Sequence, residues 1–420
     1  MMEDKITIKK HLMRKIKLNG LYSFLQRYPE KPWHWGSYGL SCNPSVTLEL
    51  LDLYPLKPWH WGKYGLSHNR SITLEWIDRY PEKPWDWCSP YGLSNNPAVT
   101  LEWIDRYFEK PWNWRLLSSN PNFTVEWIER YPDKPWNWGK NGLSCNRGVT
   151  INIVEKYRKK PWHWGYNGLS SNPNITIEWI ERYPKKPWDW IGISSNESIT
   201  TEWFDKYPMA AWTCEYGLSY NPNITLEWLK YDFGWWKKNQ FTHCSVSSNR
   251  NVTLEWINRY PEKPWDWGQN GFSSYPNITL EWSKQYPIKS NQLYFGKYGL
   301  SCNSAISIEW LEKYPDNGKC KCYDFEDGFS SDQIKKPWHW GSYGLSFNPS
   351  ITLEWVKRYP DKRSNPGGKS WYWGSKGLSS NPFTMQTKIN EKRFQSRILC
   401  FHILQTTLPH EVCQIITKFL

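Results

Sequence analysis

The sequence predicts a mainly α-helical solenoid of short stacked helices, with about 26 residues per repeat and a helical cap at the C-terminal end. Three observations support this fold class. A block of similar sequence recurs along most of the 420 residues, its core has helical periodicity, and the chain holds 33 Trp. Repetition at a near-constant spacing is typical of a repeat array, in which each unit is stabilised by its neighbours.

An idealised copy of the block reads S-x-N-P-x-I-T-L-E-W-I-x-R-Y-P-x-K-P-W-x-W-G-x-Y-G-L. The Thr of the idealised copy, or a Ser in its place, recurs at twelve positions. The interval between the last two positions is the longest, because the copy between them has lost the repeat pattern. These places are Thr47, Thr73, Thr100, Thr124, Thr150, Thr176, Thr200, Thr225, Thr253, Thr279, Ser307 and Thr352.

The core of each copy predicts one amphipathic helix, shown by the stretch from Ile72 to Tyr80. At 100° per residue, Ile72, Trp76 and Tyr80 share one face. Glu75 and Arg79 lie on the opposite face, four residues apart in the favourable acid-first order. Asn or Ser with Pro lies just before the helix, which suits a helix start. Pro after the Tyr ends the helix.

A second, shorter helical turn is expected from Pro84, because Pro suits the first position of a helix. Trp85 and Trp87 would then project toward opposite neighbours, and an irregular aromatic loop is the alternative. Two copies, 114–117 and 190–193, are shorter after the second Trp than the others. A two-residue change inside a helix would rotate everything after it, so a loop or helix end is expected there.

The tryptophans are expected to be the core of the array. A buried aromatic removes roughly 150–250 Å² from water, which is about 4–6 kcal/mol at roughly 25 cal/mol per Å². A short unit needs this much because ordering its backbone costs roughly 1–2 kcal/mol per residue. Aromatic platforms that stack on sugars or bases are the alternative role for these residues.

The chain divides into three parts. Residues 1–23 form a basic lead-in or cap, residues 24–384 the tandem-repeat array, and residues 385–420 a C-terminal helical cap or F-box-like segment. The net charge of +13 comes from the two ends, since residues 29–356 sum to about zero. We therefore do not expect nucleic acid to bind through the repeats, and only the basic termini would attract it.

No motif in the sequence predicts catalysis. Phosphate-binding loops, nucleophile elbows and metal-binding spacings are absent, so we expect neither an enzyme nor a cofactor. His34, His60, His163 and His339 lie between the two Trp of a copy, where other copies have Asp or Asn, which indicates a surface or turn position. Ten scattered Cys are expected to be reduced thiols. Seven Asn in glycosylation sequons are expected to start helices instead.

The N-terminal region lacks the apolar stretch of a signal peptide. No run of about 20 apolar residues predicts a membrane span.

The repeat resembles the tryptophan-rich tandem repeats of large DNA viruses that infect amoebae, through Asn-Pro-x-Ile-Thr and Lys-Pro-Trp-x-Trp. The resemblance covers about 350 residues and implies a viral source and a repeat architecture, without an activity. It implies location in the host-cell cytoplasm or in the virion. Near the C-terminus, Leu-Pro-x-Glu-Val is similar to the start of an F-box. Residues that could bind a partner there are Leu408, Pro409, Glu411, Val412, Ile415 and Ile416.

From these observations we expect a non-enzymatic scaffold for protein–protein interaction, or a structural component of a virus. The alternatives are a ubiquitin-ligase adaptor that uses the C-terminal segment, and binding of carbohydrate or nucleic acid by aromatic platforms. A helical cap would share the C-terminal pattern, so that segment has two interpretations. The partner protein is not identified by the sequence.

Overall fold

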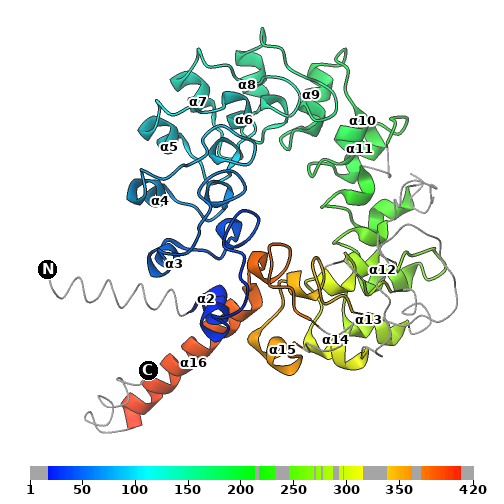
Figure 1. Cartoon of the computed structure of the whole chain (residues 1–420). Helices are drawn as coiled ribbons and strands as arrows, with labels where there is room; N and C mark the ends of the chain where they lie inside the picture. Colours follow the sequence, from blue (N-terminus) through cyan, green and yellow to red (C-terminus); the bar gives the residue numbers. More distant parts are fainter. Residues whose placement is uncertain are drawn as a thin grey trace, which may run out of the picture.

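The computed structural model describes residues 18–212, 217–231, 246–268, 271–275, 278–286, 293–296, 298–315, 338–361 and 370–407. Within these ranges the chain is a helical solenoid without a strand. Most repeats hold one six-residue α-helix and one 3₁₀ turn. The repeats follow one another around a ring, with the six-residue helices on its outer side (Figure 1).

The six-residue helices are α3 Leu48–Leu53, α4 Leu74–Arg79, α5 Leu101–Arg106, α7 Val125–Arg130, α8 Ile151–Lys156, α9 Ile177–Arg182, α11 Thr201–Lys206, α12 Leu254–Arg259, α13 Leu280–Gln285, α14 Ile308–Lys313 and α15 Leu353–Arg358. One repeat has the 3₁₀ helix η7 Leu226–Lys230 in this position.

The 3₁₀ turns are η1 Leu40–Cys42, η2 Leu66–His68, η3 Leu93–Asn95, η4 Leu143–Cys145, η5 Leu169–Ser171, η6 Leu218–Tyr220, η8 Val246–Ser248, η9 Phe272–Ser274, η11 Leu300–Cys302, η12 Leu345–Phe347 and η13 Leu378–Ser380. The two shorter copies have α6 Trp114–Leu117 and α10 Trp190–Ser194 instead. α2 Gly20–Arg27 and α16 Thr384–Thr407 are the first and last described helices.

The amphipathic helix of each repeat forms where its sequence pattern places it. α4 begins after Thr73, whose extended backbone makes it the N-cap, and the amide of Tyr80 closes the helix on the carbonyl of Trp76. Trp76 and Ile77 are buried, and Glu75 is exposed. The Thr hydroxyl makes no capping hydrogen bond, so its extended backbone is what starts the helix.

The second helical turn lies elsewhere than predicted. Pro84 to Trp87 are extended, and the turn is at Leu93–Asn95. The amides of Leu93 and Ser94 donate to the carbonyls of Asp86 and Trp87, which fixes the segment as one side of a loop. In the longer copies a loop follows the second Trp, as expected, whereas in the shorter copies the second Trp begins α6 or α10.

Glycine is required in this loop, because the chain returns very close to itself. A Cβ on Gly65 would lie 2.0 Å from the carbonyl oxygen of His60, and one on Gly344 would lie 2.0 Å from that of His339. Both contacts are with backbone, which cannot rotate away. The glycine therefore keeps the 3₁₀ turn packed against the residue between the two Trp.

Tryptophans join each unit to the next. The second Trp of one unit meets the first Trp of the following unit edge to face, as Trp61 meets Trp85 with ring centroids 5.2 Å apart. The Lys before that first Trp lies over the second Trp of the preceding unit, and Lys83 is 5.5 Å from the Trp61 centroid. The first Trp is also tied within its own unit, since Trp85 Nε1 donates to the carbonyl of Tyr80. The tryptophans are thus core residues that connect neighbours.

A ladder of buried asparagines runs through the repeats. Asn172 donates from Nδ2 to the carbonyls of Ser144 and Asn146 in the preceding unit, at 3.1 and 3.0 Å. Its Oδ1 accepts from the amide of Asn174, which shapes the turn before the next helix. Tyr275 replaces Asn in one unit and reaches the preceding unit through its hydroxyl. The asparagine positions of this ladder are Asn43, Asn69, Asn96, Asn120, Asn146, Asn172, Asn196, Asn221, Asn249, Asn303, Asn348 and Asn381.

The last repeat connects to the first by the same contacts that join consecutive repeats. Asn43 donates to the carbonyls of Ser379 and Asn381, both at 2.9 Å. Trp373 meets Trp33 edge to face with centroids 5.0 Å apart. The array is therefore a closed ring, and its two end units cover each other's buried faces.

The helices outside the array lie at this seam. α2 and α16 pack against each other, and the rings of Phe24 and Phe383 stack with centroids 4.1 Å apart. The Gly20 amide donates to the Thr387 hydroxyl at 2.9 Å. α16 then leaves the ring (Figure 1). The predicted C-terminal helix thus covers the junction between the two ends of the array.

Candidate interaction surface

The predicted partner-binding residues Leu408 to Ile416 lie outside the described residues. Their interpretation as an F-box-like motif therefore stays a prediction. Within the described residues the functional surface must be sought on the ring itself, where the repeat positions divide into those that join units and those that face solvent.

The outer surface of the ring carries a ladder of charged pairs between helices. Arg106 of α5 contacts Asp78 of α4 at 2.6 Å, and Tyr107 donates to the same carboxylate at 2.6 Å. Arg182 of α9 contacts Glu155 of α8 at 2.6 Å. Exposed pairs of this kind contribute roughly 0–1 kcal/mol each. They fix the orientation of neighbouring helices and leave a charged surface with both signs interspersed.

Three large apolar side chains are exposed at the corner between helix and Trp segment. Leu56 is 97% exposed, Met209 95% and Phe108 64%. In another repeat Lys185 takes the position of Leu56 and Met209, whereas Phe108 takes the place of the Pro that follows the Tyr in most copies. The three belong to separate units and form no continuous patch. At these positions the apolar side chain is mostly exposed, so its burial contributes little to the stability of the ring.

The loops between the second Trp and the 3₁₀ turn present exposed and half-buried tyrosines. Tyr38, Tyr64 and Tyr91 of three successive units lie ring to ring, with centroids 4.3 and 4.2 Å apart. The Tyr38 amide donates to the Tyr64 carbonyl, and the Tyr64 amide to the Tyr91 carbonyl. α6, which takes the place of this loop in its unit, lies on the inner side of the ring (Figure 1). The tyrosine loops thus form a surface separate from the charged helices.

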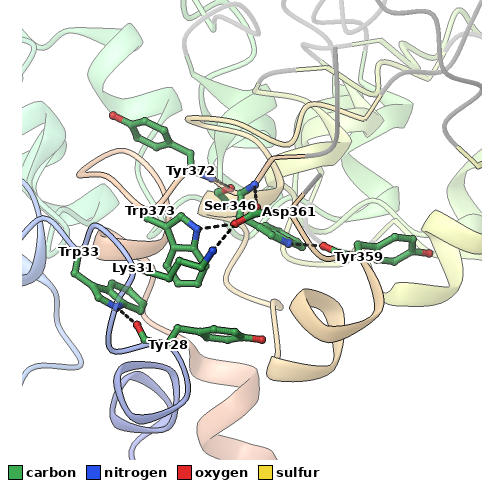
Figure 2. A network of polar contacts seen from close by, with 9 residues as sticks. Tyr28, Lys31, Trp33, Ser346, Tyr359, Asp361, Tyr372 and Trp373 are labelled. Atoms are coloured by element: carbon green, nitrogen blue, oxygen red, sulfur yellow. Dashed lines mark hydrogen bonds and ion pairs between the residues drawn. The ribbon is translucent and has the colours of Figure 1, made fainter. Parts of the chain in front are cut away.

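A half-buried ion pair holds the seam (Figure 2). Lys31 from the first unit contacts Asp361 from the last at 2.9 Å, and the Trp371 amide donates to the other carboxylate oxygen at 2.9 Å. Desolvation opposes ionisation of Asp361, but the hydrogen bonds from Lys31 and the Trp371 amide outweigh it, so the pKa of this carboxyl lies below its ordinary value. Figure 2 also shows Tyr372 pointing away from this cluster.

The histidine and cysteine positions carry no metal site in the described part of the chain, where no group of three or more His, Cys, Asp or Glu could hold a metal ion. The backbone amide of His163 donates to the Ser144 hydroxyl of the preceding unit, whereas its side chain takes no part in joining the units. Burial raises the pKa of the Cys42, Cys145 and Cys302 thiols, which makes them poor nucleophiles.

The sequon asparagines that the structure describes are structural residues, and Asn277 lies outside the described residues. Asn69 and Asn196 belong to the buried ladder, and Asn122 and Asn174 donate to carbonyls of the preceding unit. Sequence reasoning placed Asn at helix starts and missed these contacts between units. The signal that could have found them is that one Asn recurs in almost every copy, including copies whose neighbouring residues change.

No helix among the described residues is both long and apolar enough to cross a membrane. Comparisons with protein-family models, with curated proteins and with solved structures found no match. The surfaces of the ring therefore have to be interpreted from their own chemistry.

Proposed function

We propose that this chain is a non-enzymatic scaffold that binds protein partners on the outside of a rigid ring. The observation that carries the proposal is that some repeat positions join neighbouring units, whereas other positions face solvent. The Asn, Ser and Trp shared by the repeats join each unit to its neighbour. The residues that differ between repeats, such as those at the Leu56 corner, are exposed. A surface that varies over a fixed frame is how other repeat proteins recognise partners.

The resemblance to tryptophan-rich repeats of large DNA viruses adds a setting to this proposal. We propose that the partner is a host protein in the cytoplasm or another component of the virion. The exposed Leu56, Phe108 and Met209 are the apolar contacts that such a partner would cover, since large apolar residues anchor interfaces. The charged pairs around them would provide the polar rim.

Site-specific photo-crosslinking in infected cells tests the proposal. A photoreactive amino acid is introduced at Leu56, Phe108 or Met209 of the full chain, and a fourth variant carries it at Lys185, the same corner in another repeat. We expect discrete crosslinked proteins from the apolar corners and weaker or different products from Lys185. Equal, diffuse labelling at all four positions would show that the outer surface has no specific partner.

A further inference from the structure

One group of loop tyrosines is gathered in one part of the ring, although its members lie near opposite ends of the sequence. Tyr166 and Tyr220 are exposed elsewhere. Tyr298 and Tyr343 are neighbours, with centroids 5.2 Å apart, and the Tyr343 amide donates to the carbonyl of Lys376 in the next unit. That unit contacts the first repeat across the seam, where Tyr38 and Tyr64 follow. Closure of the ring thus brings two separate sets of tyrosines to neighbouring units. We call these loops the tyrosine strip: Tyr298, Tyr343, Lys376, Tyr38, Tyr64 and Tyr91.

Four tyrosines of the strip have a backbone conformation that is unfavourable for a bulky residue. Tyr38, Tyr64, Tyr298 and Tyr343 have positive φ angles of 60°, 60°, 62° and 54°. Bulky residues rarely adopt this region, whereas Asn tolerates it. Asn141 occupies the same place on the other side of the ring with φ 55°. A Tyr in a strained conformation that Asn adopts more readily indicates that the Tyr side chain has a function.

The charges in the strip are positive and close to the rings. Lys63 Nζ lies 4.9 Å from the Tyr64 centroid and 5.4 Å from that of Tyr91. Lys376 Nζ lies 5.3 Å from the Tyr343 centroid. The acid next to these loops, Asp86, is hydrogen-bonded by the amides of its own turn. Lysines therefore lie beside tyrosines of the strip, whereas the helices carry acids and bases in pairs.

Part of the aromatic surface is accessible. Tyr38 is 50% exposed, Tyr298 49% and Tyr91 41%, whereas Tyr64 and Tyr343 are half-buried beside neighbouring rings. Rows of aromatic rings with adjacent cations bind single-stranded nucleic acid, because every base can stack on a ring and every phosphate can meet a lysine. Sugar-binding aromatic sites need fixed polar groups for the hydroxyls, and the strip offers cations instead. We propose that the tyrosine strip binds single-stranded nucleic acid across the seam of the ring, without sequence preference.

Binding of a labelled oligothymidylate to the full chain, followed by fluorescence anisotropy, tests this proposal. The parent should bind the single strand more tightly than a duplex of equal length. The double variant Tyr38→Asn, Tyr64→Asn introduces at both positions the residue type that Asn141 shows to be compatible with this positive φ. It should lose about five- to a hundredfold in affinity for each base that no longer stacks, whereas Tyr→Phe at both positions should retain binding.

Three further variants separate the strip from other sources of binding. Tyr166→Asn makes the same change at an exposed tyrosine outside the strip and should leave the affinity unchanged. Lys63→Gln should reduce the slope of log affinity against log salt by roughly 0.7. Tyr298→Asn with Tyr343→Asn tests the other flank if the first double variant does not fold, as thermal denaturation would show.

Two kinds of result would overturn the proposal. One is absence of single-strand binding by the parent at low salt, or tighter binding of an oligosaccharide that is lost in the Tyr38→Asn, Tyr64→Asn variant. The other is single-strand binding that survives both tyrosine double variants and is lost when Lys392 and Arg393 on α16 are changed to Gln. That result would assign the nucleic acid to the basic end of the chain.

Discussion

At the residue scale, the asparagine ladder shows what the sequence could and could not predict. Asn172 stands where a turn precedes a helix, and the sequence was interpreted that way. Its Oδ1 does shape the turn, but its Nδ2 binds carbonyls of the preceding unit. Residue type alone could not reveal this second role, because an Asn does not show which main-chain carbonyls it binds. Only its recurrence in almost every copy indicates that it has a role beyond the local turn. The contact depends on how units stack.

Replacement of one ladder asparagine should be costly. Asn172→Ala leaves the carbonyls of Ser144 and Asn146 buried without these donors, and a buried unsatisfied group costs roughly 1–3 kcal/mol. We expect the free energy of unfolding to fall by about that amount in urea denaturation. Asn95→Ala, at an exposed asparagine, is the matched control and should change it by less than about 0.5 kcal/mol. Equal effects of the two substitutions would contradict the structural role of the ladder.

At the element scale, the helices followed from periodicity and the loops did not. The i,i+4 pattern predicted the helix that contains Trp76, and the rule for Pro predicted its end at Tyr80. The preference of Pro for the first position of a helix misplaced the second turn, because Pro84 is equally compatible with extended backbone. Hydrogen bonds from the amides of Leu93 and Ser94 to the carbonyls of Asp86 and Trp87 decide the loop instead. Rules based on neighbouring residues predict helices that their own hydrogen bonds stabilise. They do not predict loops whose conformation depends on hydrogen bonds to residues further along the chain.

The contacts between neighbouring helices give a pH dependence. Desolvation and then the hydrogen bond to Asp78 raise the pKa of Tyr107 to about 12. Folding raises the pKa of the Tyr107 hydroxyl above its unfolded value of about 10. The contact with Asp78 therefore stabilises the packing of α5 against α4 as long as the pH is below that value. That stabilisation is lost as the pH rises toward 12, because the phenolate repels the carboxylate.

Asp78→Asn should lower the pKa of Tyr107, because the amide keeps an acceptor and removes the charge. The chain already contains such a pair, since Tyr286 donates to Asn258. The difference in tyrosinate absorbance between variant and parent, followed during alkaline titration, measures the shift. Asp133→Asn, at an exposed corner, should leave the titration unchanged. An unchanged curve for Asp78→Asn would mean that burial alone sets the pKa.

At the scale of the whole molecule, closure is the property that the sequence did not reveal. A solenoid closes when the rotation between units sums to a full turn, and that rotation is a small difference in packing that no residue type encodes. The repeat pattern is only partial near Phe24–Trp35 and near Gly377–Thr384, which does not indicate that the two ends meet. Only the structure shows that Trp33 meets Trp373 as any Trp meets its neighbour. Closure also creates the tyrosine strip.

The seam should open more easily than any other junction, because its two units are joined only by non-covalent contacts. Trp373→Ala removes a side chain that contacts Trp33 and Tyr28 and lies near Lys31. Buried Trp→Ala changes cost roughly 3–5 kcal/mol. Within the array such a loss destabilises a junction whose units remain linked by the chain. At the seam, we expect it to separate the ends while the helices stay folded.

Small-angle X-ray scattering with circular dichroism distinguishes the two effects. Trp373→Ala should increase the radius of gyration at unchanged helix content, because the open array relaxes outward. Trp138→Ala is the matched control, since Trp138 meets Trp162 edge to face within the array. It should lower the free energy of unfolding by a similar amount and leave the radius of gyration as in the parent. If both variants kept the parent radius, the contacts at α2 and α16 would hold the ring closed without the Trp pair. If both expanded, the chain link between units would contribute nothing to closure, and the ring would have no distinct seam.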